Sequence, residues 1–170
     1  LNLEDNTVYG LDFANVTNYS IAPVYNMEDV EELIVQPGID KDKRINIYRY
    51  EENKGVNFAR NFGVKKSNGK FILFLDSDDY LISYSLEKVK NAINEYKEVG
   101  HFWFNCVSEA TGTKFLITPQ HKTYITFEDL LQGRYLGDYV HVVSKQYLLQ
   151  FPFFEDMRAH EGINWLRIIK

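Results

Sequence analysis

The sequence has few of the features that mark a secreted, membrane-spanning or disulfide-stabilised chain. Cys106 is its single cysteine, so no disulfide can form within the chain, which is typical of a reducing compartment. The longest apolar run, residues 71–75, is far shorter than the roughly 18 residues needed to cross a bilayer. Residues 1–5 are acidic and lack the basic and apolar regions of a signal peptide.

The sequence also lacks an excess of basic residues and a linker between domains. The formal net charge is -5, so no global positive field attracts nucleic acid, and we expect no nucleic-acid partner. Any anionic ligand must then be held by a local device such as a bound cation. No stretch rich in proline or glycine divides the 170 residues, so a single domain over residues 1–170 is predicted. The chain stops inside a predicted helix, so we expect a catalytic domain truncated at its C-terminus.

Hydrophobic patterning predicts an α/β protein. Ser85 and Thr126 are the expected N-caps of two helices, and Lys114–Thr118 is the expected partner of the strand 101–107. The predicted strands are 19–26, 45–50, 70–75, 101–107 and 139–143, and the predicted helices are 57–66, 85–96, a short one after Thr126, and 162–169.

The strongest chemical signal is an acidic segment directly after a strand. The apolar run 70–75 has the length of a strand buried on both faces, and Asp76, Asp78 and Asp79 follow at once. Ligands of open α/β sheets bind beyond the carboxyl ends of strands, and Mg²⁺ or Mn²⁺ commonly bridges carboxylates to substrate phosphates. The alternative for such a triplet alone is a solvated acidic turn or a helix cap.

A second segment, residues 52–61, precedes that strand. Gly55 allows a tight loop into the helix 57–66, and Lys54 and Arg60 are cations that can reach a diphosphate or a ribose. Taken alone, the segment is equally typical of a loop and helix with surface charges.

Together these segments resemble the inverting family 2 glycosyltransferases. Residues 53–61 (NKGVNFARN) and 69–79 (GKFILFLDSDD) match the family's pattern at the family's spacing, and 23–26 (PVYN) resembles its opening segment. The resemblance implies a GT-A fold, which is a Rossmann-like α/β fold with a mixed central sheet flanked by helices. It also implies transfer of a sugar from a nucleotide-diphosphate sugar, usually a UDP-sugar, with Mn²⁺ or Mg²⁺ as cofactor.

The resemblance assigns roles to particular residues. Asp78 would be the direct metal ligand, with Asp76 near the metal or the ribose. Pro23 and Tyr25 would border the nucleoside pocket, with Arg60 close to it. The family often builds surface polysaccharides, which implies a bacterial cytoplasmic hexosyl- or hexosaminyltransferase at the inner membrane face, with a glycan or glycolipid acceptor.

At two places the sequence departs from the family's pattern, and both departures affect the roles assigned to these residues. Gln36 and Pro37 stand where acids usually contact the nucleoside, so either recognition is altered or residues between Asn26 and Glu31 are absent from the chain. Near the end, Glu161 matches the Glu of the family's Glu-Asp motif, and Gly162 stands in place of the Asp that carries the base. Glu161 is the candidate base if the register shifts by one residue, and otherwise a helix N-terminal acid favoured by the dipole.

The departures keep two other functions open. A degenerate, non-catalytic sugar-nucleotide binding module is favoured by the lost acids and by Gly162. A nucleotidyltransferase also uses paired acids and a metal, but its usual glycine-rich phosphate loop is not found here.

The remaining chemistry-bearing residues predict packing more than catalysis. The histidines lack metal-ligand spacing, and the cysteine lies in an apolar strand. One tryptophan follows the candidate base and can line an acceptor site. These structural expectations cover His101, His121, His141, Cys106, Trp103 and Trp165.

Overall fold

The computed structural model describes most of the chain from residue 45 onward and two short parts before it. Residues 27–34, whose sequence allows one or two helical turns, lie outside the described residues, as do Pro23, Tyr25, Asp78 and His121. The described residues are 7–12, 19–21, 45–49, 53–76, 79–112, 116–117, 124–157 and 160–169.

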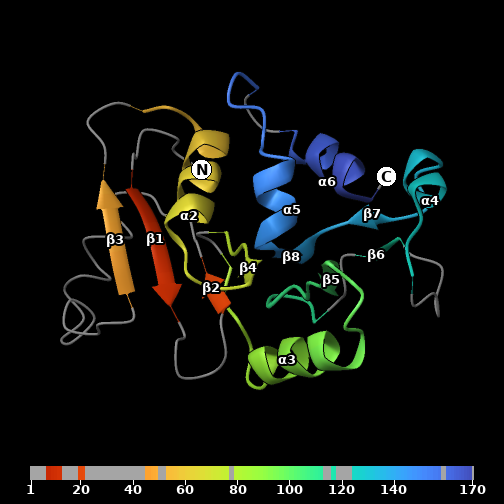
Figure 1. The fold of residues 1–170 in the computed structure, drawn as a ribbon. Helices are drawn as coiled ribbons and strands as arrows, with labels where there is room; N and C mark the ends of the chain where they lie inside the picture. Colours follow the sequence, from red (N-terminus) through yellow and green to blue (C-terminus); the bar gives the residue numbers. More distant parts are fainter. Residues whose placement is uncertain are drawn as a thin grey trace.

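Strands and helices are interspersed from residue 45 onward, as expected for an α/β protein (Figure 1). The strands are β1 (Thr7–Asp12), β2 (Tyr19–Ile21), β3 (Ile45–Arg49), β4 (Phe71–Leu73), β5 (His101–Asn105), β6 (Leu116–Ile117), β7 (Leu136–Gly137) and β8 (Tyr139–Ser144). The helices are α2 (Val56–Lys66), α3 (Ser85–Glu95), α4 (Phe127–Leu131), α5 (Lys145–Gln150) and α6 (Glu161–Ile169).

Six of the strands form one mixed sheet in the order β3-β1-β2-β4-β8-β5. β2 and β4 are parallel, with Ile21 opposite Leu73. β4 pairs antiparallel with β8, which pairs antiparallel with β5. The sheet therefore carries the end of β4 and the middle of β8 side by side, which brings the acidic segment next to His141.

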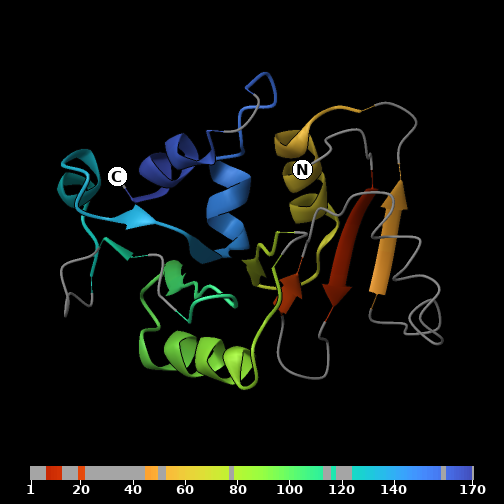
Figure 2. The same cartoon turned by 180° about the vertical axis from the view of Figure 1, so that it is seen from behind.

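Helices cover both faces of the sheet around β4, as Figures 1 and 2 show from opposite sides. Ile72 and Phe74 pack into one core with residues of α2, α5 and α6, whereas Leu73 and Leu75 pack into the other with α3. Alternate side chains of a strand point to opposite faces, so burial of all four explains the uninterrupted apolar run. Burial of each stabilises the fold by about 1.5–3 kcal/mol.

Local sequence signals placed most helix starts well. The Thr126 hydroxyl accepts a hydrogen bond from the Asp129 N–H, and the Asp129 carboxylate accepts one from the Thr126 N–H, which is a capping box. Gly55 precedes α2 with a φ of 83°, a conformation that favours glycine, as the tight loop predicts.

Three expectations were wrong at this level. Tyr84, with a left-handed φ of 66°, is the N-cap of α3, and Ser85 is the first helical residue, because the turn before it reverses the chain without a side-chain cap. β6, within the range 114–118, pairs with β7, since β5 already lies beside β8. The regular part of β4 ends at Leu73, two residues before the apolar run does.

Candidate active site

The acidic segment begins where β4 leaves the sheet. Leu75 is buried, and the next residue, Asp76, is exposed, so the chain emerges from the core at this point. The Asp79 N–H donates to the Asp76 carbonyl over 3.1 Å, which folds the segment into a turn. Both described carboxylates line one pocket.

Arg60 is the charged residue buried at the centre of the site. It lies on α2 and is only 9% exposed. Its Nη2 is 3.6 Å from Asp76 Oδ1, and its Nη1 is 3.4 Å from Glu161 Oε2. Its guanidinium also lies 5.6 Å from the centre of the Phe153 ring. One fork-shaped cation thus joins two carboxylates that are far apart in the sequence.

Glu161 is the first residue of α6, at the helix end that favours a carboxylate. His160 before it has a left-handed φ of 73° and accepts a hydrogen bond from the Ile163 N–H. The Glu161 side chain is 41% exposed, so its carboxylate contacts both Arg60 and the open pocket. Glu161 thus stands at a helix start and shares the pocket with Asp76 and Asp79.

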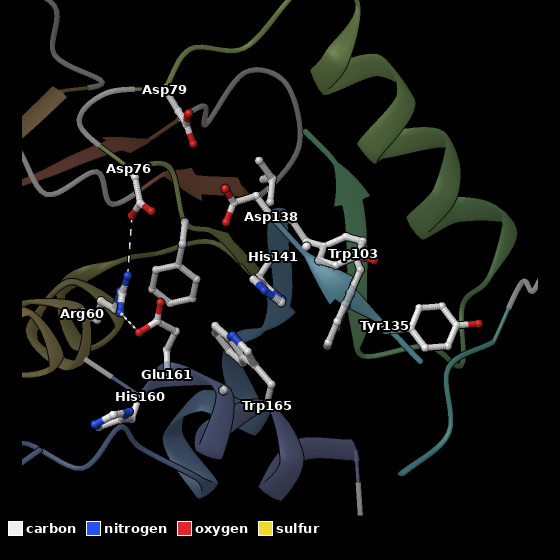
Figure 3. A pocket seen from close by; sticks show the side chains of 15 residues that line it. Arg60, Asp76, Asp79, Trp103, Tyr135, Asp138, His141, His160, Glu161 and Trp165 are labelled. Carbon is white, nitrogen blue, oxygen red and sulfur yellow. Dashed lines mark ion pairs between the residues drawn. The ribbon is translucent and has the colours of Figure 1, made fainter. Parts of the chain in front are cut away.

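The pocket has a volume of about 450 Å³ and two unlike halves (Figure 3). Asp76, Asp79 and Arg60 lie on one side, and Trp103 and Tyr135 lie on the other, with Glu161, Asp138 and His141 between them. It is lined by Arg60, Phe74, Asp76, Asp79, Trp103, Tyr135, Gly137, Asp138, Tyr139, Val140, His141, His160, Glu161, Gly162 and Trp165.

Two buried asparagines of α2 hold the segment that leads to Glu161. The Asn61 amide donates to the Phe153 carbonyl, and its oxygen accepts from the Phe153 N–H, both over 2.9 Å. The Asn57 amide donates to the carbonyls of Phe154 and Met157 over 2.8 and 2.7 Å. Asn57 and Asn61 of NKGVNFARN are thus internal struts in the described structure, because they pair with backbone groups of residues 153–157 that would otherwise be unpaired.

The ligand atoms at the end of β4 are of the type that a hard divalent cation binds. Asp76 and Asp79 supply carboxylate oxygens, the ligands that Mg²⁺ and Mn²⁺ prefer, and Arg60 faces Asp76 from the other side. Among the described residues no three acidic, histidine or cysteine side chains are grouped as metal ligands, and Asp78 falls outside them.

Sequence reasoning missed part of the pocket wall. Tyr135 immediately precedes β7, Asp138 joins β7 to β8, and Tyr139 begins β8. Asp138 adds a fourth described carboxylate to the pocket. The only available signal was an acid just ahead of a predicted strand, which is too common to single out. Trp165 is buried, as expected for a packing residue, and it also lines the pocket.

Cys106 is partly buried just after β5. Burial, helped by the negative charges of Asp79 and Asp138, raises the pKa of its thiol to about 11. The thiol therefore stays protonated at neutral pH, which fits the expected inert role.

A mixed sheet with acids at the end of a central strand, and with a carboxylate facing them from a later helix, is typical of α/β proteins that bind ligands beyond the carboxyl ends of their strands. The model of the glycosyl transferase family 2 matches residues 26–154. The chain belongs to this family.

Relatives with this similarity come from several bacteria. A Haemophilus influenzae glycosyltransferase is 36% identical over 124 residues, which are 70% of this chain and 48% of that protein. The Campylobacter jejuni GalNAc(5)-diNAcBac-PP-undecaprenol beta-1,3-glucosyltransferase is 29% identical over 85% of this chain and 48% of its own. Escherichia coli WfgD, a UDP-Glc:alpha-D-GlcNAc-diphosphoundecaprenol beta-1,3-glucosyltransferase, is 29% identical over 76% of this chain and 50% of its own. The chain spans about half the length of these relatives.

The solved structure of S. aureus TarS 1-349 has the same fold. It aligns with a TM-score of 0.65 and 15% identity over 88% of this chain and 53% of TarS. The predicted GT-A type α/β fold is confirmed by this likeness and by the family. None of the helices in the described ranges is long and apolar enough to cross a membrane.

Proposed function

We propose that this chain transfers a hexosyl or hexosaminyl group from a nucleotide-diphosphate sugar, a UDP-sugar, to a hydroxyl of a glycan or glycolipid, with inversion. One observation carries the proposal: Arg60 brings the acids at the end of β4 and Glu161 of α6 to one pocket of about 450 Å³. A pocket of this size suits a small polar ligand rather than a macromolecule.

The residues divide the task between them. The donor's diphosphate lies at the acidic segment, where Asp78 and Asp76 would hold a Mn²⁺ or Mg²⁺ ion. Bound there, the ion would supply Lewis-acid stabilisation of the diphosphate leaving group. Arg60, Pro23 and Tyr25 border the nucleotide. Because Arg60 also contacts Glu161, it keeps that carboxylate on the donor's side of the pocket.

Glu161 acts as the general base. Its carboxylate takes the proton of the acceptor hydroxyl as that oxygen attacks the anomeric carbon from the face opposite the diphosphate. The new carbon–oxygen bond forms as the bond to the diphosphate breaks, which inverts the anomeric configuration. The exposed part of the Glu161 side chain, 41%, leaves room for an acceptor to reach it.

The relatives' names suggest the kind of acceptor. Two of them are named for acceptors built on undecaprenol diphosphate. We propose that the acceptor is a lipid-linked glycan of bacterial surface polysaccharide synthesis, bound at the inner face of the membrane.

A transfer assay with Glu161→Gln tests the mechanism. The variant should transfer sugar about a hundredfold to ten-thousandfold more slowly, because a base is lost, while UDP binding measured by calorimetry stays intact. Glu161→Asp is the matched variant, since it keeps the carboxylate and should retain part of the rate. A Gln variant that works at the wild-type rate would show that another group is the base.

The same assay decides the second candidate, a binding module without catalysis. Gly162, in the place of the family's acid, favours it. Wild-type protein that binds UDP tightly but neither transfers nor hydrolyses the donor would support the module.

A further inference from the structure

Four aromatic rings meet beneath the pocket, and two of them are histidines that the proposed mechanism does not use. His141 of β8 stacks on Trp165 of α6, with ring centres 4.3 Å apart and planes 20° apart. Trp103 of β5 meets the His141 ring edge-on at 4.8 Å. His101, also on β5, lies 5.2 Å from His141. The His141 ring is therefore fixed in orientation by its neighbours.

A single hydrogen bond links the two histidines, between His101 Nε2 and His141 Nδ1 at 2.9 Å. Burial lowers the pKa of both imidazoles, that of His101 to about 3, so both rings are neutral at pH 7. A neutral imidazole carries one N–H, and only one proton can lie between the two nitrogens. One of the two rings therefore donates this hydrogen bond. Which ring donates determines whether the other nitrogen of each ring carries a proton or a lone pair.

The burial of His101 Nδ1 indicates which ring donates. This nitrogen is fully buried and has no hydrogen-bond partner. If His141 were the donor, His101 would carry its proton on Nδ1, as an unpaired N–H inside the protein. Such buried unpaired donors are rarer than unpaired acceptors. His101 is therefore the donor, and His141 carries its own proton on Nε2.

Of the two His141 nitrogens, only Nε2 is left for a ligand in the pocket, since Nδ1 bonds His101. The His141 ring lines the cavity, and its Nε2 is not one of the buried, unpartnered nitrogens found among the described residues. Figure 3 shows His141 beside Trp165 and farther than Glu161 from Arg60 and Asp76. With the donor at the acidic segment, this side of Glu161 is the one that an acceptor must occupy.

We propose that His141 holds the acceptor: its Nε2–H donates a hydrogen bond to a hydroxyl oxygen of the acceptor sugar, and His101 fixes the tautomer that supplies this donor. The acceptor role rests on the proposed function, whereas the tautomer does not. The neighbouring rings of Trp103 and Trp165 give the sugar's apolar face a surface to rest on.

Nitrogen NMR of the whole chain tests the tautomer directly. In protein labelled with ¹⁵N-histidine, two-bond correlations distinguish an Nε2–H ring from an Nδ1–H ring, and loss of a signal in His141→Phe assigns it. We expect His141 in the Nε2–H form at pH 7. An Nδ1–H form would overturn the proposal, because the nitrogen facing the pocket would then be an acceptor.

Kinetics test the contact. His141→Phe keeps a flat ring against Trp165 but removes the donor, so the acceptor KM should rise about tenfold, the loss of one hydrogen bond, with UDP affinity unchanged. His141→Gln can donate from the place of Nε2 and should recover part of that loss. An unchanged acceptor KM in a folded Phe variant would refute the contact. Wild-type protein without transfer activity would instead refute the proposed function and the acceptor role, and the tautomer would be decided by NMR alone.

Discussion

The buried histidine pair should make the protein's stability depend on pH between 8 and 5. Burial lowers the pKa of His101 from 6.5 to about 3, and that of His141 also falls. The unfolded chain then binds more protons than the folded one below pH 6.5. Stability is therefore complete above pH 6.5 and is lost as the pH falls towards the folded pKa.

The size of the effect follows from these pKa values. Each pH unit below 6.5 costs about 1.4 kcal/mol for His101 while its folded ring stays neutral. At pH 5 this histidine alone lowers the free energy of unfolding by about 2 kcal/mol relative to pH 8. His141 adds to the loss in the same direction.

Urea unfolding at several pH values measures this, with His101→Phe as the test variant. Removing His101 should flatten the slope between pH 6 and 5 by about 1.4 kcal/mol per unit, whatever it does to stability at pH 8. Val142→Ala is the control, because it opens a cavity in β8, the strand paired with β5, and should lower stability equally at every pH. A His101→Phe slope equal to that of the wild type would refute the reasoning, since the ring would then titrate alike in both states.

Three further outcomes are expected. UDP should bind more weakly in EDTA than with Mn²⁺, and Asp78→Asn should remove that difference in calorimetry; equal affinities in wild type would exclude a cation held there. Arg60→Ala should weaken UDP-sugar binding by about 1–3 kcal/mol, and Arg60→Lys should restore only part of it because Lys cannot contact two carboxylates as a fork. Asn61→Ala should cost about 1–3 kcal/mol in unfolding free energy by leaving the Phe153 N–H unpaired, so a fully stable variant would contradict the strut role.

The sequence by itself determined much of the fold. The run 70–75 was identified as a strand buried on both faces because local hydrophobicity alone records that burial, and the structure buries 72–75 on both sides. The helix at 57–66 and the cap at Thr126 rest on signals within a few residues, and both are confirmed. The sequence analysis missed β1 and α5. Each has only six residues of mixed polarity, which is too short for a clear hydrophobic periodicity.

The sequence also identified the segments that form the site. It predicted less well which residues the side chains of these segments contact. Arg60 was expected beside the nucleotide, and its contacts in the structure are the carboxylates of Asp76 and Glu161. The nucleotide role stays a prediction. Asn57 and Asn61 carried no assigned role, because a polar residue in a helix has the same local pattern whether it faces water or a buried carbonyl.

Only the tertiary structure decided which distant residues meet. His101 and His141 showed no metal-ligand spacing and were expected to be structural, yet their pairing sets which nitrogen faces the pocket. Hydrogen bonds and ion pairs act over about 3–4 Å, so they depend on strand register and on the direction of each side chain. Hydrophobic periodicity tells which face of an element is buried. It does not tell which residue of another element lies against it, and that pairing is what makes Arg60, Glu161 and His141 parts of one site.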